Sequence, residues 1–279
     1  MRRKTYTFLN DVRDGLMKLS PHLTLRIDRM YMQRIDWSGQ VNYPVDILLV
    51  VLETAGGDGF RNLSGAGRCE FQAGHAYFMP PDNTLAFTLS LGTRFVAFQF
   101  NLELFSGFDL FSGLHDCVDI EDHAFAKRID TLFQGKDDFE LLCLAKGELY
   151  AFAGRLGLRS PEEIKRLMLG GHEYAPLFAL LNDGLDARTP VSALAAAMKL
   201  SPEQLSRRFH RDFGMTVKTC MSRRLLRQAM AKLAQPGMTA RRTARDLKFS
   251  SEFYFSRFFK QHAGLSPRQF KQQFSQPGR

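Results

Sequence analysis

A segment in the C-terminal part of this chain occurs twice. Residues 201–209, SPEQLSRRF, return fifty residues later as residues 251–259, SEFYFSRFF. A glycine closes each copy, Gly214 in the first and Gly264 in the second, and a short apolar helical pattern precedes each copy. Two helices joined by a short turn form a helix-turn-helix unit. The sequence therefore predicts two such units in series.

The second helix of each predicted unit has two different faces. Helical spacing places Leu205 and Phe209 on the core face of the first copy, and Phe255 and Phe259 on the core face of the second. The opposite face carries the side chains that we expect to contact the bases of DNA: Glu203, Ser206, Arg207, Glu252, Phe253, Ser256 and Arg257.

Arginine is the residue best suited to read bases from such a helix. The major groove admits one α-helix, and a guanidinium group can pair with two acceptors on guanine. We therefore expect Arg207 and Arg257 to read bases. The alternative is that each contacts a phosphate, which gives affinity without sequence information.

Charge is distributed unevenly along the chain. Residues 185–279 contain 19 Lys and Arg against 5 Asp and Glu, whereas residues 1–184 contain 19 against 24. A basic surface can serve solubility alone, but an anionic polymer is the commoner reason for such asymmetry. Five basic residues are predicted to contact backbone phosphates, with release of counterions: Arg208, Arg211, Lys218, Lys260 and Lys271.

The segment between the two units is predicted to be one helix. Residues 216–234 are strongly helical in pattern and end before Pro236 and Gly237. At 1.5 Å per residue, this helix would be about 28 Å long. Because one turn of DNA is about 34 Å, we expect a spacer of this length to place the two recognition helices in successive major grooves.

Residues 185–274 resemble the DNA-binding domain of the AraC family of bacterial transcription regulators. The matching residues are Arg224-Leu225, Ala229, Leu233, Ala244, Phe249-Ser250, Tyr254 to Lys260, Gly264, Ser266-Pro267 and Phe270. The resemblance implies a regulator, activator or repressor, that binds promoter DNA as a homodimer and contacts RNA polymerase. It also implies that Arg224 makes a structural ionic contact rather than reading a base. Two lysines, Lys199 and Lys248, stand where the turn glycine is common, and Thr243 replaces a typical isoleucine.

The N-terminal part has a different pattern. Short extended runs at 23–27, 47–52, 76–79 and 95–100 are separated by turn residues, which predicts a small β-barrel. Helical patterns follow at 123–134, 138–157, 161–169 and 174–185. We expect an α+β chain with a cupin-like N-terminal domain at 1–181, a linker at 182–190 and the DNA-binding domain at 191–279. The segment Gly74 to Pro81 followed by Phe95 to Phe100 resembles the barrel that precedes the DNA-binding domain in many family members.

The resemblance implies that this barrel binds a small effector. The predicted pocket residues are Trp37, Tyr43, Phe78, Phe87, Phe98 and Arg94, with Arg94 placed to meet an anionic group; the alternative is that the aromatic residues form the barrel core. A dimer seam is predicted from 3-4 spacing at Leu142, Ala145, Leu149, Phe152 and Leu156, although a helix packed on the barrel would have the same pattern. A second alternative is that the N-terminal domain only dimerises or binds a protein partner.

Other classes of protein fit the sequence less well. A cupin metal enzyme needs converging histidines and a carboxylate, but only His75 lies in the relevant strands. A DNA-repair alkyl acceptor needs a metal-supported cysteine, whereas the four cysteines stand alone: Cys69, Cys117, Cys143 and Cys220. We therefore expect no catalysis, no metal and no cofactor. No apolar stretch approaches the length of a membrane helix, and acidic residues interrupt the start of the chain, so we expect a cytoplasmic protein.

Overall fold

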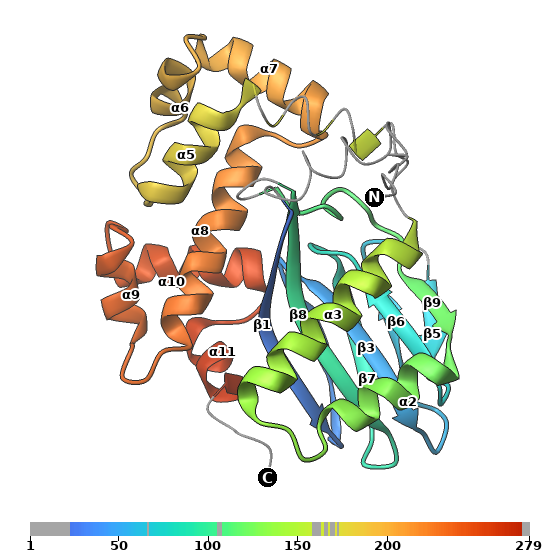
Figure 1. Ribbon diagram of the computed structural model, residues 1–279. Coiled ribbons are helices and arrows are strands. Elements are labelled where there is room, and N and C mark those ends of the chain that lie inside the picture. Colours follow the sequence, from blue (N-terminus) through green and yellow to red (C-terminus); the bar gives the residue numbers. More distant parts are fainter. Residues whose placement is uncertain are drawn as a thin grey trace, which may run out of the picture.

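The computed structural model describes residues 23–274, apart from residue 66 and residues 105–107, 158–162, 165–166, 168–170 and 172. The N-terminal part is built from β-sheets with helices on one face, and the C-terminal part is helical and lies alongside it (Figure 1). The predicted helix 161–169 falls largely outside the described residues, as does the start of the chain. No described helix is both long enough and apolar enough to cross a membrane.

The N-terminal strands form two antiparallel sheets. The five-stranded sheet contains, in spatial order, β1 (Leu23–Gln33), β8 (Arg94–Leu104), β3 (Asp46–Glu53), β6 (His75–Met79) and β9 (Val118–Glu121). The four-stranded sheet contains β2 (Trp37–Asn42), β7 (Thr84–Leu89), β4 (Gly59–Asn62) and β5 (Gly67–Glu70). All four predicted extended runs lie in these strands. The predicted cupin-like fold is confirmed, and its described strands form two separate sheets that face each other rather than a closed barrel.

Two apolar cores stabilise this part of the chain. One lies between the sheets and contains large residues such as Phe60, Tyr77 and Phe95. The other lies between the five-stranded sheet and two helices, α2 (His123–Leu132) and α3 (Asp138–Leu156), which cover its outer face (Figure 1). Each helix begins with an aspartate whose side chain accepts a backbone N–H, Asp122 for α2 and Asp137 for α3.

The predicted dimer seam on α3 is wrong as an intermolecular contact. Ala145, Leu149 and Phe152 are buried in the core beneath the helix, and Leu156 packs against the same core. Leu142 is instead 41% exposed. The 3-4 spacing therefore marks the face that packs on the five-stranded sheet, because a single helix on a sheet needs the same apolar stripe as a coiled coil.

The C-terminal part shares one core among its helices. These are α5 (Ala175–Asp183), α6 (Val191–Ala197), α7 (Pro202–Phe213), α8 (Val217–Leu233), α9 (Ala240–Asp246), α10 (Glu252–Ala263) and α11 (Pro267–Phe274). α5 packs with the first unit, since Leu177 and Leu181 belong to this core and the ring of Tyr174 lies 5.1 Å from that of Phe213. This packing favours a domain boundary before Tyr174 rather than within the predicted linker 182–190.

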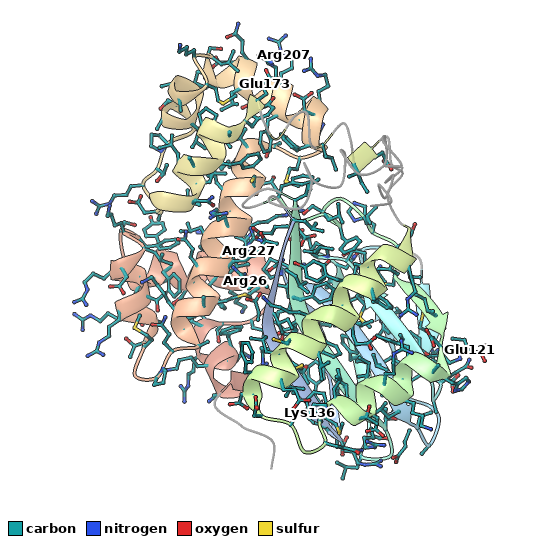
Figure 2. All side chains as sticks on the ribbon, viewed as in Figure 1. Arg26, Glu121, Lys136, Glu173, Arg207 and Arg227 are labelled. Carbon is teal, nitrogen blue, oxygen red and sulfur yellow. The ribbon has the colours of Figure 1, made fainter. Side chains whose placement is uncertain are left out.

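The two parts of the chain are in direct contact along α8. Arg227 of α8 forms an ion pair with Glu103 of β8 at 2.6 Å, with only 6% of the arginine side chain exposed. Arg223, one turn earlier, forms an ion pair with Asp82 at 2.5 Å. Figure 2 shows Arg227 between α8 and the N-terminal sheets. The central helix of the C-terminal part is therefore docked on the N-terminal part.

Candidate DNA-binding surface and internal cavity

The two recognition helices begin and end in the same way. Ser201 caps α7 by accepting the Gln204 N–H at 3.2 Å, and Ser251 caps α10 by accepting the Tyr254 N–H at 3.2 Å. Gly214 and Gly264 end the helices with φ near +70°, where glycine is favoured. Residues 201–213 and 251–263 also have the same order of buried and exposed positions. The sequence repeat is therefore a structural repeat.

The turns before the recognition helices explain the two unusual lysines. Lys199 has a φ of 54° and Lys248 a φ of 56°, both in the left-handed region. In each turn the next amide closes back on the preceding helix: Leu200 N donates to Ala195 O, and Phe249 N donates to Ala244 O, both at 2.9 Å. The lysines therefore adopt the same turn that a glycine would form. Their side chains cause steric strain, because the left-handed region is unfavourable for L-residues.

The predicted base-reading residues lie on the outer faces of α7 and α10. Glu203, Arg207, Glu252 and Arg257 are exposed, Ser206 and Ser256 are half-buried, and Phe253 is 71% exposed. Figure 2 shows Arg207 on the side of the first unit that faces away from the N-terminal sheets. Both copies thus present a hydroxyl and a guanidinium at matching positions, whereas the carboxylates of Glu203 and Glu252 are offset by one position.

The predicted phosphate-contacting residues fall into three groups. Lys218 and Lys260 are exposed. Arg208 forms an ion pair with Glu173, and Arg211 forms one with Asp212 at 2.8 Å, so phosphate would have to replace these carboxylates. Lys271 is half-buried, and its Nζ donates to the carbonyl of Met238. The geometry gives Lys271 a structural contact and does not support its assignment to phosphate.

The connecting helix matches its predicted bounds. α8 has 17 residues, which corresponds to a length of about 25 Å, and Figure 1 shows it running between the two units. Arg224 has the structural role that the resemblance implied, but its contacts are not ionic. Its Nε donates to Leu181 O at 2.5 Å, and a terminal nitrogen donates to Asn182 Oδ1. This ties α8 to α5.

A groove between residues 185–191, α8 and the second unit was not predicted. It has a volume of about 610 Å³ and an apolar floor that includes Leu225 and Phe249. Arg188, Lys218 and Lys248 line it, and Lys248 pairs with Asp186 at 2.8 Å. Residues 185–190 fold back onto the second unit, since Ala187 N donates to Leu247 O at 2.9 Å. The sequence analysis placed Arg188 in a linker because no local sequence signal indicates this contact.

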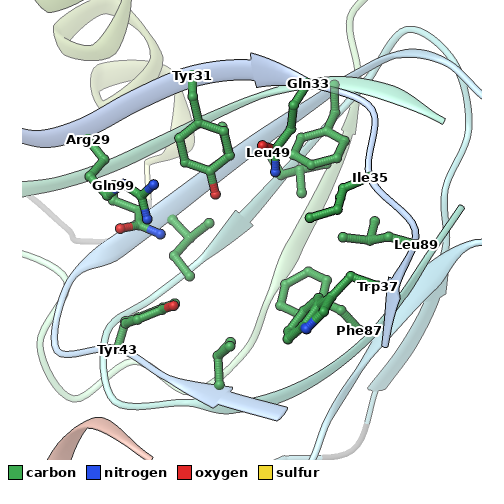
Figure 3. Close-up of a pocket in the computed structure, with 14 residues that line it drawn as sticks. Arg29, Tyr31, Gln33, Ile35, Trp37, Tyr43, Leu49, Phe87, Leu89 and Gln99 are labelled. Carbon is green, nitrogen blue, oxygen red and sulfur yellow. The ribbon is translucent and has the colours of Figure 1, made fainter. Parts of the chain in front are cut away.

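The N-terminal part contains an internal cavity between its two sheets, with a volume of about 240 Å³ (Figure 3). Of the predicted pocket residues, Trp37, Tyr43 and Phe87 line it. Phe78 and Phe98 do not, since both point to the opposite face of the five-stranded sheet and join the core beneath α2 and α3. Their prediction was wrong because neighbouring residues of a strand face opposite sides.

Arg94 also lies outside this cavity. It forms ion pairs with Glu53 and Asp130, each at 2.7 Å, and these carboxylates raise the pKa of its guanidinium. The cationic residue that does line the cavity is Arg29, together with Tyr31, Gln33 and Gln99. Sequence reasoning missed Arg29, Tyr31 and Gln33 because a β-bulge in β1 changes which side chains of this strand face inward.

The described histidines and cysteines bear on the two alternatives, a metal enzyme and an alkyl acceptor. Nδ1 of His75 lies 2.8 Å from Oδ1 of Asp119. Among the described residues, no three potential metal ligands come together. Burial raises the pKa of the Cys117 thiol to about 12 and raises that of Cys69 and Cys220 as well. Raised thiol pKa values disfavour the reactive thiolate.

Comparisons with known proteins agree with this architecture. Residues 194–273 match a family described as helix-turn-helix domain. The arabinose operon regulatory protein of Salmonella typhimurium is 30% identical over 86 residues, 31% of this chain and 31% of that protein. The chain thus matches about a third of the length of this curated relative. The family match at residues 194–273 spans the sequence repeat.

Similarity to solved structures extends over nearly the whole chain. The structure of apo ToxT K231A from Vibrio cholerae has a TM-score of 0.60 at 9% identity, covering 91% of this chain and 98% of that one. A second ToxT structure, with unsaturated fatty acid bound, has a TM-score of 0.55 at 9% identity and covers 88% and 94%. At such identities the likeness concerns the fold: a cupin-like domain followed by helix-turn-helix units.

Proposed function

This chain belongs to the AraC family through its C-terminal helix-turn-helix domain, and on that premise we propose that it is a sequence-specific regulator of promoters. The structural repeat carries the proposal. Arg207 and Arg257 occupy matching exposed positions on α7 and α10, and a helix of 17 residues connects the two units. A duplex with two half-sites about one turn apart would meet one arginine in each of two successive major grooves.

The test is selection of genomic fragments by the purified full-length protein at two salt concentrations. We expect enrichment of a bipartite motif with half-sites about 10 bp apart. Fragments retained without a common motif, and lost together as salt rises, would mean that the basic surface only attracts phosphate. Such a result would contradict sequence-specific regulation. A regulator of bacterial promoters acts in the cytoplasm, where the DNA lies.

We also propose that a small molecule in the cavity between the sheets modulates DNA binding. Two contacts link the cavity to the DNA-binding units. Val41 and Tyr43 line the cavity, and Asn42 between them lies against Gly264 at the end of α10. Tyr43 O accepts the backbone N–H of Asp82 at 3.0 Å, and Asp82 pairs with Arg223 of α8. A ligand that moves this segment of β2 would therefore press directly on the second unit.

The competing function is a regulator whose N-terminal domain only dimerises or binds a protein partner. Thermal stability in the presence of small metabolites separates the two. A ligand at 100 times its Kd stabilises a protein by about 2.7 kcal/mol. A broad library without any stabilising compound would favour the second function.

A homodimer is part of the same proposal, although of the predicted seam only Leu142 is exposed enough to contact a second chain. α3 exposes three apolar side chains, Phe139 (77%), Leu142 (41%) and Leu144 (41%). An apolar face of this kind is suited to a second copy of the chain. Sedimentation of the Leu142→Glu and Phe139→Glu variants tests it: the native chain should sediment as a dimer and the variants as monomers. Contact with RNA polymerase stays a prediction from the resemblance.

A further inference from the structure

A β-bulge determines which residues of β1 face the cavity. Before the bulge, Leu25 and Ile27 pack toward α2 and α3; after it, Met30 and Met32 do so. The register with β8 shifts between Ile27 and Arg29. This shift turns the following odd-numbered residues, Arg29, Tyr31 and Gln33, to the inner face, where they line the cavity. Bulges often redirect side chains in this way next to binding sites.

The cavity has a polar end and an apolar end. Arg29 pairs directly with Gln99 across the β1–β8 ladder, so both side chains lie at the same level. Figure 3 shows these two at one end, with the hydroxyl groups of Tyr31 and Tyr43 directed into the space beside them. At the other end lie Trp37, Phe87, Leu89 and Ile35. A ligand that fits would have one polar group and an apolar body.

The aromatic wall is held in a fixed position. The rings of Trp37 and Phe87 lie 6.3 Å apart at an angle of 37°. Gly39 makes room for the indole, because a Cβ at this position would lie 2.6 Å from Cζ2 of Trp37. The glycine thus lets the flat indole turn across the strand, and the indole forms a wall of the cavity.

The charge of the lining favours an anion. Among the 14 lining residues, all of them described, Arg29 is the only one with a charged side chain. Its guanidinium lies 4.9 Å from the ring centre of Tyr31. Burial raises the pKa of Tyr31 and Tyr43, so their hydroxyl groups remain protonated and can donate hydrogen bonds. A carboxylate at this end would receive charge-assisted hydrogen bonds.

We propose that the cavity binds a small organic carboxylate whose apolar part is about one ring in size, with the carboxylate at Arg29 and Gln99 and the ring against Trp37 and Phe87. The size follows from the volume of about 240 Å³, since an apolar cavity of about 150 Å³ holds one benzene molecule. The inference rests on the proposed function and names the effector class. A sugar fits less well, because its hydroxyl groups need partners on all sides.

Trp37 provides a direct reporter of occupancy, because it is the only tryptophan in the chain. The experiment titrates full-length protein with benzoate, phenylacetate, 3-phenylpropionate and hexanoate, and with the neutral amide of each, while tryptophan fluorescence is recorded. We expect at least one carboxylate to bind tenfold or more tightly than its amide. If every acid binds no better than its amide, or if neither changes the fluorescence, the inference is wrong.

The Arg29→Gln variant tests the role of the guanidinium. It should weaken binding of the preferred carboxylate at least tenfold and leave binding of the amide within about twofold, and Arg29→Lys should recover part of the loss. The matched control is Arg34→Gln, because Arg34 lies beyond the same strand, pairs with Glu53 and does not line the cavity. Equal losses for acid and amide in Arg29→Gln would mean that Arg29 only supports the fold. Far-UV circular dichroism checks that each variant is folded.

The result is independent of the DNA experiment. Preference for a carboxylate without a DNA motif would keep the ligand inference and contradict the proposed regulator. A DNA motif without preference for the carboxylate would keep the regulator and overturn the ligand class.

Discussion

Lys199 and Lys248 hold backbone angles that suit glycine. Holding an L-residue in the left-handed region destabilises the folded state by about 1–2 kcal/mol. Glycine avoids this strain, but it offsets part of the gain because its greater conformational freedom stabilises the unfolded chain. We therefore expect Lys199→Gly and Lys248→Gly each to raise the free energy of unfolding by about 1 kcal/mol, measured by urea denaturation. Lys127→Gly within α2 is the matched control and should lower it by about 1 kcal/mol. If all three substitutions destabilise equally, the turn strain is absent.

Asp46 is a buried acid that should make stability depend on pH. Burial, followed by the nearby charge of Asp109, raises the pKa of Asp46 well above its usual value. The folded state therefore keeps a proton that the unfolded chain loses near pH 4. As pH rises from that value toward the folded pKa, stability falls by up to about 1.4 kcal/mol per pH unit for this proton.

The Asp46→Asn variant removes this titration. Its unfolding free energy, measured in urea from pH 4 to pH 8, should fall less steeply than that of the native chain and should exceed it at pH 8. Asp36→Asn, at an exposed position, is the control and should follow the native profile. Parallel profiles for Asp46→Asn and the native chain would contradict the protonated state of Asp46.

At the scale of elements, the two recognition helices should contribute separately to DNA specificity. Arg207→Ala and Arg257→Ala should each cost about 1–3 kcal/mol of binding free energy at the selected site and leave nonspecific binding nearly unchanged. Fluorescence anisotropy with the selected duplex and a scrambled duplex measures both. Arg128→Ala on α2, which removes an ion pair with Glu148, is the control. Equal losses on both duplexes would assign these arginines to phosphate instead.

Elements could be predicted from the sequence where their signals are local. Each recognition helix contains its own signals: a capping serine, a closing glycine and apolar residues at helical spacing, such as Leu205 and Phe209. The helix-turn-helix units therefore lie where they were predicted. The strand positions were predicted for the same reason. The apolar stripe of α3 was located correctly, but it packs on the five-stranded sheet and not on a second chain. A periodic pattern identifies an apolar face without identifying what covers that face.

The cavity was less predictable because it depends on pairing between distant strands. Trp37, Tyr43 and Phe87 were expected from their residue type and do line it. Arg29 could not be found by counting alternate residues, since the register shift after Ile27 reverses the alternation in β1. Only the pairing of β1 with β8 reveals this shift, and no local sequence signal records it.

At the scale of the whole molecule, the position of the DNA-binding units depends on how α8 is docked. The Glu103–Arg227 ion pair joins β8 to α8, and its two side chains are only 15% and 6% exposed. Removing one partner of a buried ion pair leaves the other charge without its counterion, which commonly costs about 3–5 kcal/mol. Replacing both partners by neutral residues avoids most of this cost.

Glu103→Gln should therefore lower the thermal stability of the full-length protein far more than Glu121→Gln, which affects an exposed pair with His123. The double variant Glu103→Gln, Arg227→Met should recover a large part of the loss. Scanning calorimetry measures these three variants, the Arg227→Met single variant and the native chain, and the double variant should lose less stability than the two single substitutions lose together. If the losses simply add, the ion pair does not hold the two parts together. In that case the contact of Gly264 with β2 would be the main route between the cavity and the DNA-binding units.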